Sequence, residues 1–171
     1  TLLIEAISKL QRSDIICLFV GDFQGRNKYY TELKKLIDKL KLKNNFRIIS
    51  NQSDMATIYK LADVVVSTSL EPEAFGRVVA EAQAMGRPTI AVNHGGGPEI
   101  IIDGQTGWLF KPGDADDLSD KINSALNLNK EDRYKMAMGA IERAKLNFNN
   151  ETMCAKTLQV YAELVNKQCL I

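Results

Sequence analysis

The sequence contains almost no histidine, few cysteines and no long apolar run. His94 is the only histidine, so this chain does not offer a metal site built from several histidines or a histidine-rich catalytic cluster. The cysteines are Cys17, Cys154 and Cys169, and none has C-x-x-C spacing. An odd number of unpaired thiols indicates a reduced, cytosolic protein and not a disulfide framework or a zinc site. No apolar run approaches the ~20 residues that a membrane span needs.

The sequence also lacks an excess of charge of either sign. Lys and Arg total 22 and Asp and Glu total 21, and no basic stripe carries interleaved aromatic residues. Nucleic acid is therefore not expected as a partner. Hydrophobic residues make up 45% of 171 residues, which is enough for the core of one ordinary domain.

What the sequence does contain is a regular alternation of short apolar runs and helical patterns. Helices are expected at 2–10, 29–40, 54–61, 76–85, from Pro98, and at 114–126, 129–141 and 151–165. The apolar stripe of the last helix predicts packing into the core, with contact to the other domain of the full-length protein as the alternative. Strands are expected at 15–20, 46–49, 64–66, 88–92 and 108–110. The continuous run at 15–20 predicts a strand buried on both faces. The alternation predicts an α/β fold with a doubly wound, Rossmann-like parallel sheet that binds ligands at the carboxyl ends of its strands.

The loop after the strand at 64–66 carries the residues best suited to ligand binding. Gly76 lets the backbone approach a ligand just before the next helix, whose first amides attract an anion such as a diphosphate. Glu73 precedes that helix and can accept hydrogen bonds from sugar hydroxyls. Glu81 lies within the helix and can hold two hydroxyls of a ribose.

Each of these residues also has an ordinary interpretation. Glu73 can be a solvated loop carboxylate, and Arg77 and Glu81 stand four apart, as in a surface ion pair worth ~0.3–0.5 kcal/mol. His94 is expected to be a loop residue without a chemical role. The glycines at 95–97 predict a loop that passes close to another molecule.

The longer string around the two glutamates reads Glu73-x-Phe75-Gly76-x-x-x-x-Glu81-Ala82-x-Ala84-x-Gly86-x-Pro88-x-Ile90-Ala91. This string resembles the glycosyltransferase group 1 family, a large retaining family with the two-domain GT-B fold. In that family the pattern is a pair of glutamates separated by seven residues. The resemblance continues at 19–22, 62–64, 95–101, 103–109 and 112–114, so it spans essentially the whole chain.

The resemblance implies roles for particular residues. Glu73 matches the glutamate that contacts the donor sugar, and Glu81 matches the one that holds the ribose. The backbone of Phe75, Gly76 and Arg77 matches positions that approach the sugar and the diphosphate. Three further residues match places near the phosphates and the base, although an ordinary strand-to-loop turn also explains them; they are Gly21, Asp22 and Asn51.

The family typically needs no metal, and no cofactor is expected beyond the nucleotide-sugar donor. Asp114-Ala115-Asp116 spells a D-x-D tripeptide, but it follows Pro112-Gly113 and opens a helix. Helix capping is the expected role of Asp114.

The chain departs from the family pattern at its start. Residues 1–171 match a nucleotide-sugar-binding domain without its first strand, without the Arg and Lys that follow that strand, and without the N-terminal acceptor domain. That strand is central in the fold, so its loss leaves two neighbouring strands with unpaired edges. We therefore expect a fragment that is not a complete enzyme alone.

The resulting hypothesis is the donor-binding domain of a retaining hexosyltransferase that uses GDP-mannose or a UDP-sugar. Residues 72–86 look like bacterial lipopolysaccharide-core mannosyltransferases, which implies a glycan or lipopolysaccharide acceptor. The expected location is the cytoplasm, at the inner face of the membrane, with peripheral contact only through the full-length protein. The alternatives are a nucleotide-binding module without catalysis and half of a nucleotide-sugar epimerase, against which the glutamate pair argues. The base, sugar, acceptor, linkage and oligomeric state stay open.

Overall fold

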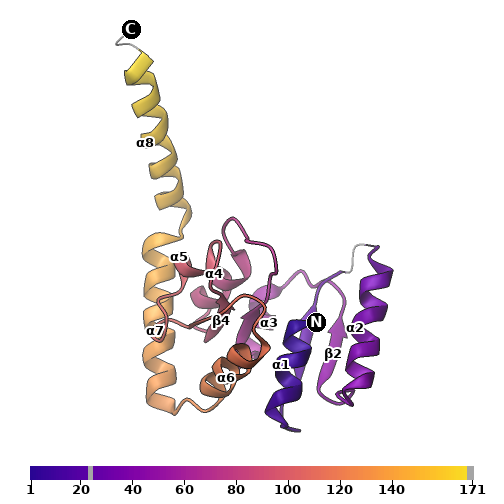
Figure 1. Cartoon of the computed structure of the whole chain (residues 1–171). Helices are drawn as coiled ribbons and strands as arrows, with labels where there is room; N and C mark the ends of the chain where they lie inside the picture. Colours follow the sequence, from indigo (N-terminus) through magenta and orange to yellow (C-terminus); the bar gives the residue numbers. More distant parts are fainter. Residues whose placement is uncertain (23–24, 169–171) are drawn as a thin grey trace.

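The computed structural model describes residues 1–22 and 25–168, which form alternating helices and strands (Figure 1). The strands are β1 (Cys17–Val20), β2 (Phe46–Ile49), β3 (Val65–Ser67), β4 (Thr89–Val92) and β5 (Trp108–Phe110). The helices are α1 (Leu2–Leu10), α2 (Asn27–Lys39), α3 (Met55–Leu61), α4 (Arg77–Ala84), α5 (Gly97–Ile100), α6 (Ala115–Leu126), α7 (Lys130–Asn147) and α8 (Asn150–Gln168). The expected elements are confirmed, with bounds shifted by a few residues.

All strand pairs are parallel, which confirms the predicted α/β class, but the strands form two sheets instead of one. One sheet has the order β1-β2 and the other the order β3-β4-β5. Within the part of the chain that the structure describes, β1 pairs only with β2, and β3 only with β4. One edge of β1 and one edge of β3 are therefore left without a strand partner.

One hydrophobic core connects the two sheets. Ile4 and Ile7 of α1 pack in the same buried cluster as Phe46 of β2, Ile90 of β4 and Leu118 of α6. Helix α1 packs directly on α6, and α4 packs on α7. Because apolar burial is the main stabilising term, this shared cluster holds the two sheets in one body.

Short-range hydrogen bonds fix where several helices begin. The Asp54 carboxylate accepts from the amide of Thr57 at the start of α3, and the Asn129 side chain accepts from the amide of Asp132 at the start of α7. Asp114 accepts from the amides of Asp116 and Asp117. The capping role predicted for Asp114 is confirmed.

The prediction that the run at 15–20 is buried on both faces is wrong. Regular strand begins only at Cys17; Ile16 is 62% exposed and Leu18 is 41% exposed. Cys17 and Phe19 pack against the core, whereas Leu18, which alternates with them, points to the opposite face. A continuous apolar run does not reveal whether a second layer covers that opposite face.

The two described cysteines differ in environment, and this difference can be tested. Cys17 is half-buried, and burial raises the pKa of its thiol to about 11, whereas Cys154 is exposed. At pH 8 about one Cys17 thiol in a thousand is then the reactive thiolate. We expect iodoacetamide to alkylate Cys154 at least ~10-fold faster than Cys17 in the folded protein, as read by peptide mass spectrometry. Urea should remove the difference, and equal rates in the folded protein would contradict the buried position of Cys17.

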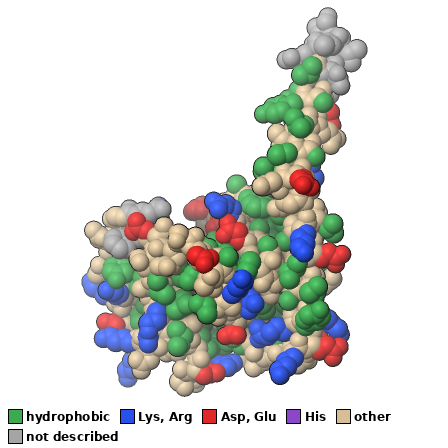
Figure 2. All heavy atoms as spheres, turned by 180° about the vertical axis from the view of Figure 1, so that it is seen from behind, with side chains coloured by type: hydrophobic (Ala, Val, Ile, Leu, Met, Phe, Trp, Pro, Cys, Tyr) green, Lys and Arg blue, Asp and Glu red, His purple; other side chains and the backbone are tan. Residues whose placement is uncertain are grey.

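The terminal helix does not pack into the core, contrary to the prediction. Helix α8 projects from the body of the domain (Figure 1) and carries apolar side chains along its length (Figure 2). Exposed fractions of 53–66% are found at Met153, Leu158, Val160, Tyr161, Leu164 and Val165. The apolar stripe was recognised correctly, but a stripe does not specify which surface covers it. No helix among the described residues is long and apolar enough to cross a membrane.

Candidate functional site

The loop between β3 and α4 folds back so that Glu73 lies beside the start of the helix. Gly76 is the N-cap of α4 and has a left-handed backbone with φ of 90°. A β-carbon at that position would lie 3.6 Å from Oε2 of Glu73. The hydroxyl of Ser69 donates a hydrogen bond to Oε1 of Glu73. The carboxylate is therefore oriented toward the helix terminus, in an exposed loop.

Two glycines of the next loop hold this segment in place. The amide of Gly96 donates to the carbonyl of Glu73 at 2.9 Å. A β-carbon on Gly96 would lie 2.0 Å from the carbonyl oxygen of Phe75, and one on Gly95 would lie 2.6 Å from that of Glu73. The prediction that the glycines at 95–97 pass close to another molecule thus needs correction for these two, because their close neighbour is the backbone of residues 73–75.

The first turn of α4 faces the same space. The first hydrogen bonds of this helix are donated by the amides of Val79 and Ala80 to the carbonyl of Gly76, at 3.0 and 3.2 Å. The amides of Arg77 and Val78 lie before these donors, so they have no acceptor within the helix and point outward from its N-terminus. Amides in this position and the helix dipole together favour an anionic group.

Glu81 lies one turn into α4 and is held through both carboxylate oxygens. Nη2 of Arg77 donates to Oε1 at 3.0 Å, which is the ion pair that four-residue spacing predicts. The hydroxyl of Tyr59, on α3, donates to Oε2 at 2.9 Å. Burial raises the pKa of Tyr59 to about 12, and the hydrogen bond and charge of Glu81 add to this.

Tyr59 is the residue that sequence reasoning missed. It is 5% exposed and lies in the helix predicted at 54–61, for which the sequence suggested no role in ligand binding. Its partner is 22 positions away on another element, and no spacing rule relates the two. The available signal was indirect, since a buried tyrosine hydroxyl usually has a hydrogen-bond partner.

The remaining predicted residues lie on the other sheet. Gly21 follows β1, and its amide donates to the carbonyl of Ile49, the last residue of β2, at 3.0 Å. Asp22 and Asn51 are exposed at the carboxyl ends of the same two strands. Gly21, Asp22 and Asn51 therefore share one sheet edge, while Glu73 and Glu81 belong to the connection after β3.

His94 follows β4, in the loop that supports Glu73. Both of its ring nitrogens are buried and have no hydrogen-bond partner among the described residues. Its amide donates to the carbonyl of Val92 at 2.9 Å, so its backbone continues a turn. Among the described residues, the ring therefore forms no hydrogen bond with Glu73 or Glu81 that would assign it a chemical role.

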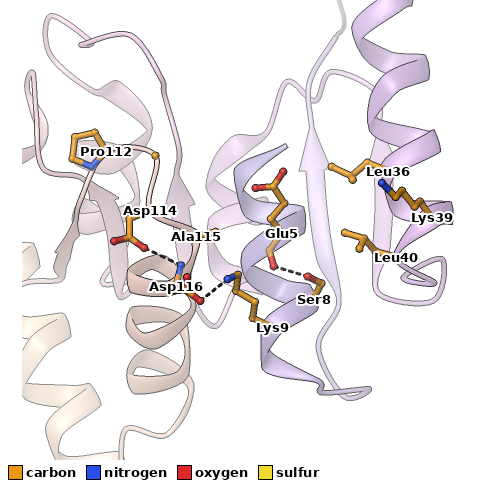
Figure 3. A pocket seen from close by; sticks show the side chains of 11 residues that line it. Glu5, Ser8, Lys9, Leu36, Lys39, Leu40, Pro112, Asp114, Ala115 and Asp116 are labelled. Carbon is orange, nitrogen blue, oxygen red and sulfur yellow. Dashed lines mark hydrogen bonds and ion pairs between the residues drawn. The ribbon is translucent and has the colours of Figure 1, made fainter.

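Two cavities of the described chain lie away from these residues. One, of about 710 Å³, opens between α1, α2 and the start of α6 (Figure 3). There Lys9 pairs with Asp116, and the lining includes Glu5 and Lys39. The other, also about 710 Å³, lies between α7 and the loop 102–108. Neither is lined by Glu73, Glu81 or the other predicted donor-binding residues.

Known proteins with similar sequences and structures are glycosyltransferases. The pattern of the family described as "Glycosyl transferases group 1" matches residues 1–145. Sucrose synthase 5 of Arabidopsis thaliana is 36% identical over 131 residues, covering 68% of this chain and 16% of that protein.

Two solved structures extend the likeness to nearly the whole chain. The crystal structure of a glycosyltransferase from Rickettsia africae is 38% identical with a TM-score of 0.90, covering 96% of this chain and 44% of that one. Anabaena Alr3699/HepE, solved in complex with UDP and glucose, is 28% identical with a TM-score of 0.87, covering 95% of this chain and 44% of that one. The chain thus spans less than half the length of these relatives. The match over residues 1–145, together with the paired glutamates at the α4 terminus, shows that this chain belongs to the glycosyl transferases group 1 family.

Proposed function

We propose that this chain is the donor-binding domain of a retaining hexosyltransferase that moves a sugar from a nucleotide sugar to a glycan or lipopolysaccharide acceptor. The observation that carries the proposal is the position of Glu73 and Glu81 on either side of the α4 N-terminus. Glu73, the start of α4 and Glu81 thus lie in the order in which the sugar, the diphosphate and the ribose follow one another in a nucleotide sugar. The similar Anabaena protein was solved with UDP and glucose.

In this arrangement each part of the donor has its own partner. Glu73 accepts hydrogen bonds from hydroxyls of the transferred sugar, while the backbone at Phe75, Gly76 and Arg77 approaches the sugar and the diphosphate. The free amides at the start of α4 stabilise the negative charge that develops on the leaving diphosphate. Glu81 holds the ribose.

The proposed retention of configuration is best explained by a route without a covalent enzyme intermediate. A double displacement needs a carboxylate nucleophile on the reacting face of the sugar. Glu73 is engaged with hydroxyls in this proposal, and sequence reasoning placed no second carboxylate there. An acceptor hydroxyl instead attacks the anomeric carbon on the face that the diphosphate leaves, and its proton passes to the departing phosphate oxygen.

The wider context of the reaction belongs to the same proposal. The UDP found in the Anabaena relative favours a UDP-sugar, and GDP-mannose is the alternative that the mannosyltransferase-like residues 72–86 support. The first strand with its Arg and Lys, and an acceptor-binding domain, would complete the enzyme. Its place would be the cytoplasm, at the inner face of the membrane. A nucleotide-binding module without catalysis is the second candidate function.

Nucleotide binding by the chain tests the donor site directly. We expect UDP or GDP, and their sugars, to bind weakly, with dissociation constants near the millimolar range (about −4 kcal/mol). Isothermal titration calorimetry measures this, with circular dichroism to verify folding. A folded sample that gives no heat with any of these nucleotides at millimolar concentrations would count against an intact donor site.

A further inference from the structure

Glu81 has spare hydrogen-bonding capacity in a defined direction. An ionised carboxylate can accept about four hydrogen bonds, two at each oxygen. Tyr59 uses one position on Oε2 and Arg77 uses one on Oε1. Two positions are left, which is the number that the vicinal hydroxyls of a ribose require.

The two donors to Glu81 differ in how firmly they can hold it. The side chain of Arg77 is 84% exposed, and an exposed ion pair between neighbouring turns is weak and screened by salt. Tyr59 is 5% exposed, so packing around its ring limits where its hydroxyl can lie. The contact from Tyr59 is therefore the one expected to fix the rotamer of Glu81.

Tyr59 is itself anchored by the surrounding fold. Helix α3 is capped at its start by Asp54, and Nη1 of Arg133 on α7 donates to the carbonyl of Asp63, two residues beyond the helix, at 3.0 Å. The raised pKa of Tyr59 keeps its hydroxyl protonated across the range in which an enzyme is assayed, so it stays a donor. A buried ring on an anchored helix presents that hydroxyl at a fixed point.

We propose that Tyr59 is a positioning residue that orients the Glu81 carboxylate toward the ribose hydroxyls of the donor. This inference rests on the proposed function, because it requires Glu81 to be the ribose ligand. Tyr59 need not touch the nucleotide. It acts by limiting the rotamers that Glu81 explores before the nucleotide arrives, so that less ordering is needed on binding.

The test is the preference of the protein for a nucleotide with ribose hydroxyls. In the full-length enzyme, the affinities of UDP and of 2′,3′-dideoxy-UDP are measured by calorimetry for the wild type, Tyr59→Phe, Glu81→Gln and the double variant, and GDP with its dideoxy analogue is run in parallel. We expect the wild type to prefer the ribose form by roughly 10- to 100-fold, and Tyr59→Phe to lower this preference about three- to tenfold. In the Glu81→Gln background, Tyr59→Phe should have no further effect.

Controls separate positioning from a general loss of structure. Tyr134→Phe removes the same oxygen from a tyrosine on α7 that is 67% exposed, and it should leave the preference unchanged. A merely structural role of Tyr59 would weaken UDP and its dideoxy analogue equally, and would persist without Glu81. Either result overturns the positioning role.

Failure of the proposed function looks different from failure of this inference. If the wild type and Glu81→Gln show the same preference for ribose hydroxyls, Glu81 is not the ribose ligand and both proposals fall. If Glu81→Gln loses the preference while Tyr59→Phe keeps all of it, the donor site stands and only the role of Tyr59 is overturned.

Discussion

Replacing Gly96 with alanine is expected to disrupt the donor site more than the same substitution at any other glycine of this chain. The new β-carbon would lie 2.0 Å from the carbonyl oxygen of Phe75 and 2.5 Å from its carbonyl carbon, both backbone atoms that cannot rotate away. Residues 73–75 must therefore shift, and the 2.9 Å hydrogen bond from Gly96 to Glu73 breaks with them. Overpacking of this kind costs about 1–3 kcal/mol or more.

Thermal unfolding and nucleotide titration measure the two consequences. At roughly 2–4 °C per kcal/mol for a domain of this size, the melting temperature of Gly96→Ala should fall by about 2–12 °C. Nucleotide-sugar affinity should fall at least ~10-fold, because Glu73 and the start of α4 lose their relative placement. A variant that melts and binds like the wild type would show that the two loops do not pack as described.

Gly139→Ala is the matched control for this substitution. Gly139 lies inside α7, and the nearest atom to an added β-carbon, Cγ2 of Thr106, is 3.8 Å away. Alanine is favoured over glycine in a helix interior by roughly 0.5–1 kcal/mol. The control should therefore be neutral or slightly stabilising and should bind nucleotide as the wild type does.

The second large effect separates the two glutamates. In the full-length enzyme, Glu73→Gln should lower kcat much more than it weakens binding of the bare nucleoside diphosphate, because the bare nucleotide lacks the sugar. Glu81→Gln should weaken binding of both the donor and the bare nucleotide, since each contains the ribose. Each lost charge-assisted hydrogen bond costs on the order of 1.5–3 kcal/mol, which corresponds to a roughly ten- to hundredfold loss of kcat or of affinity. Turnover and nucleoside-diphosphate titration are measured in parallel.

Glu131→Gln provides the control for loss of an exposed ion pair. Glu131 pairs with Lys135 at 2.8 Å with the same four-residue spacing as the pair formed by Arg77 and Glu81, but on α7. Its substitution should change neither kcat nor nucleotide affinity. If Glu73→Gln weakens nucleoside-diphosphate binding as much as Glu81→Gln does, the two roles assigned here are wrong.

The sequence alone predicted the features that depend on neighbours a few positions apart. The cap by Asp114 joins its side chain to the amides two and three residues on, so spacing is sufficient to find it. The ion pair of Arg77 and Glu81 follows in the same way from one helical turn. Strand and helix order followed from apolar periodicity, and the family resemblance followed from the string between Glu73 and Ala91.

The tertiary structure alone decided which distant segments meet. It brought Tyr59 to Glu81 and Gly96 to Phe75, and it left Leu18 and the apolar side of α8 uncovered. Periodicity identifies the apolar face of a helix or strand, but whether another element covers that face depends on how the elements pack in three dimensions. The sequence therefore determined the two glutamates and the helix that carries the second of them, whereas the contacts that orient these carboxylates exist only once α3, α4 and the loop after β4 have come together.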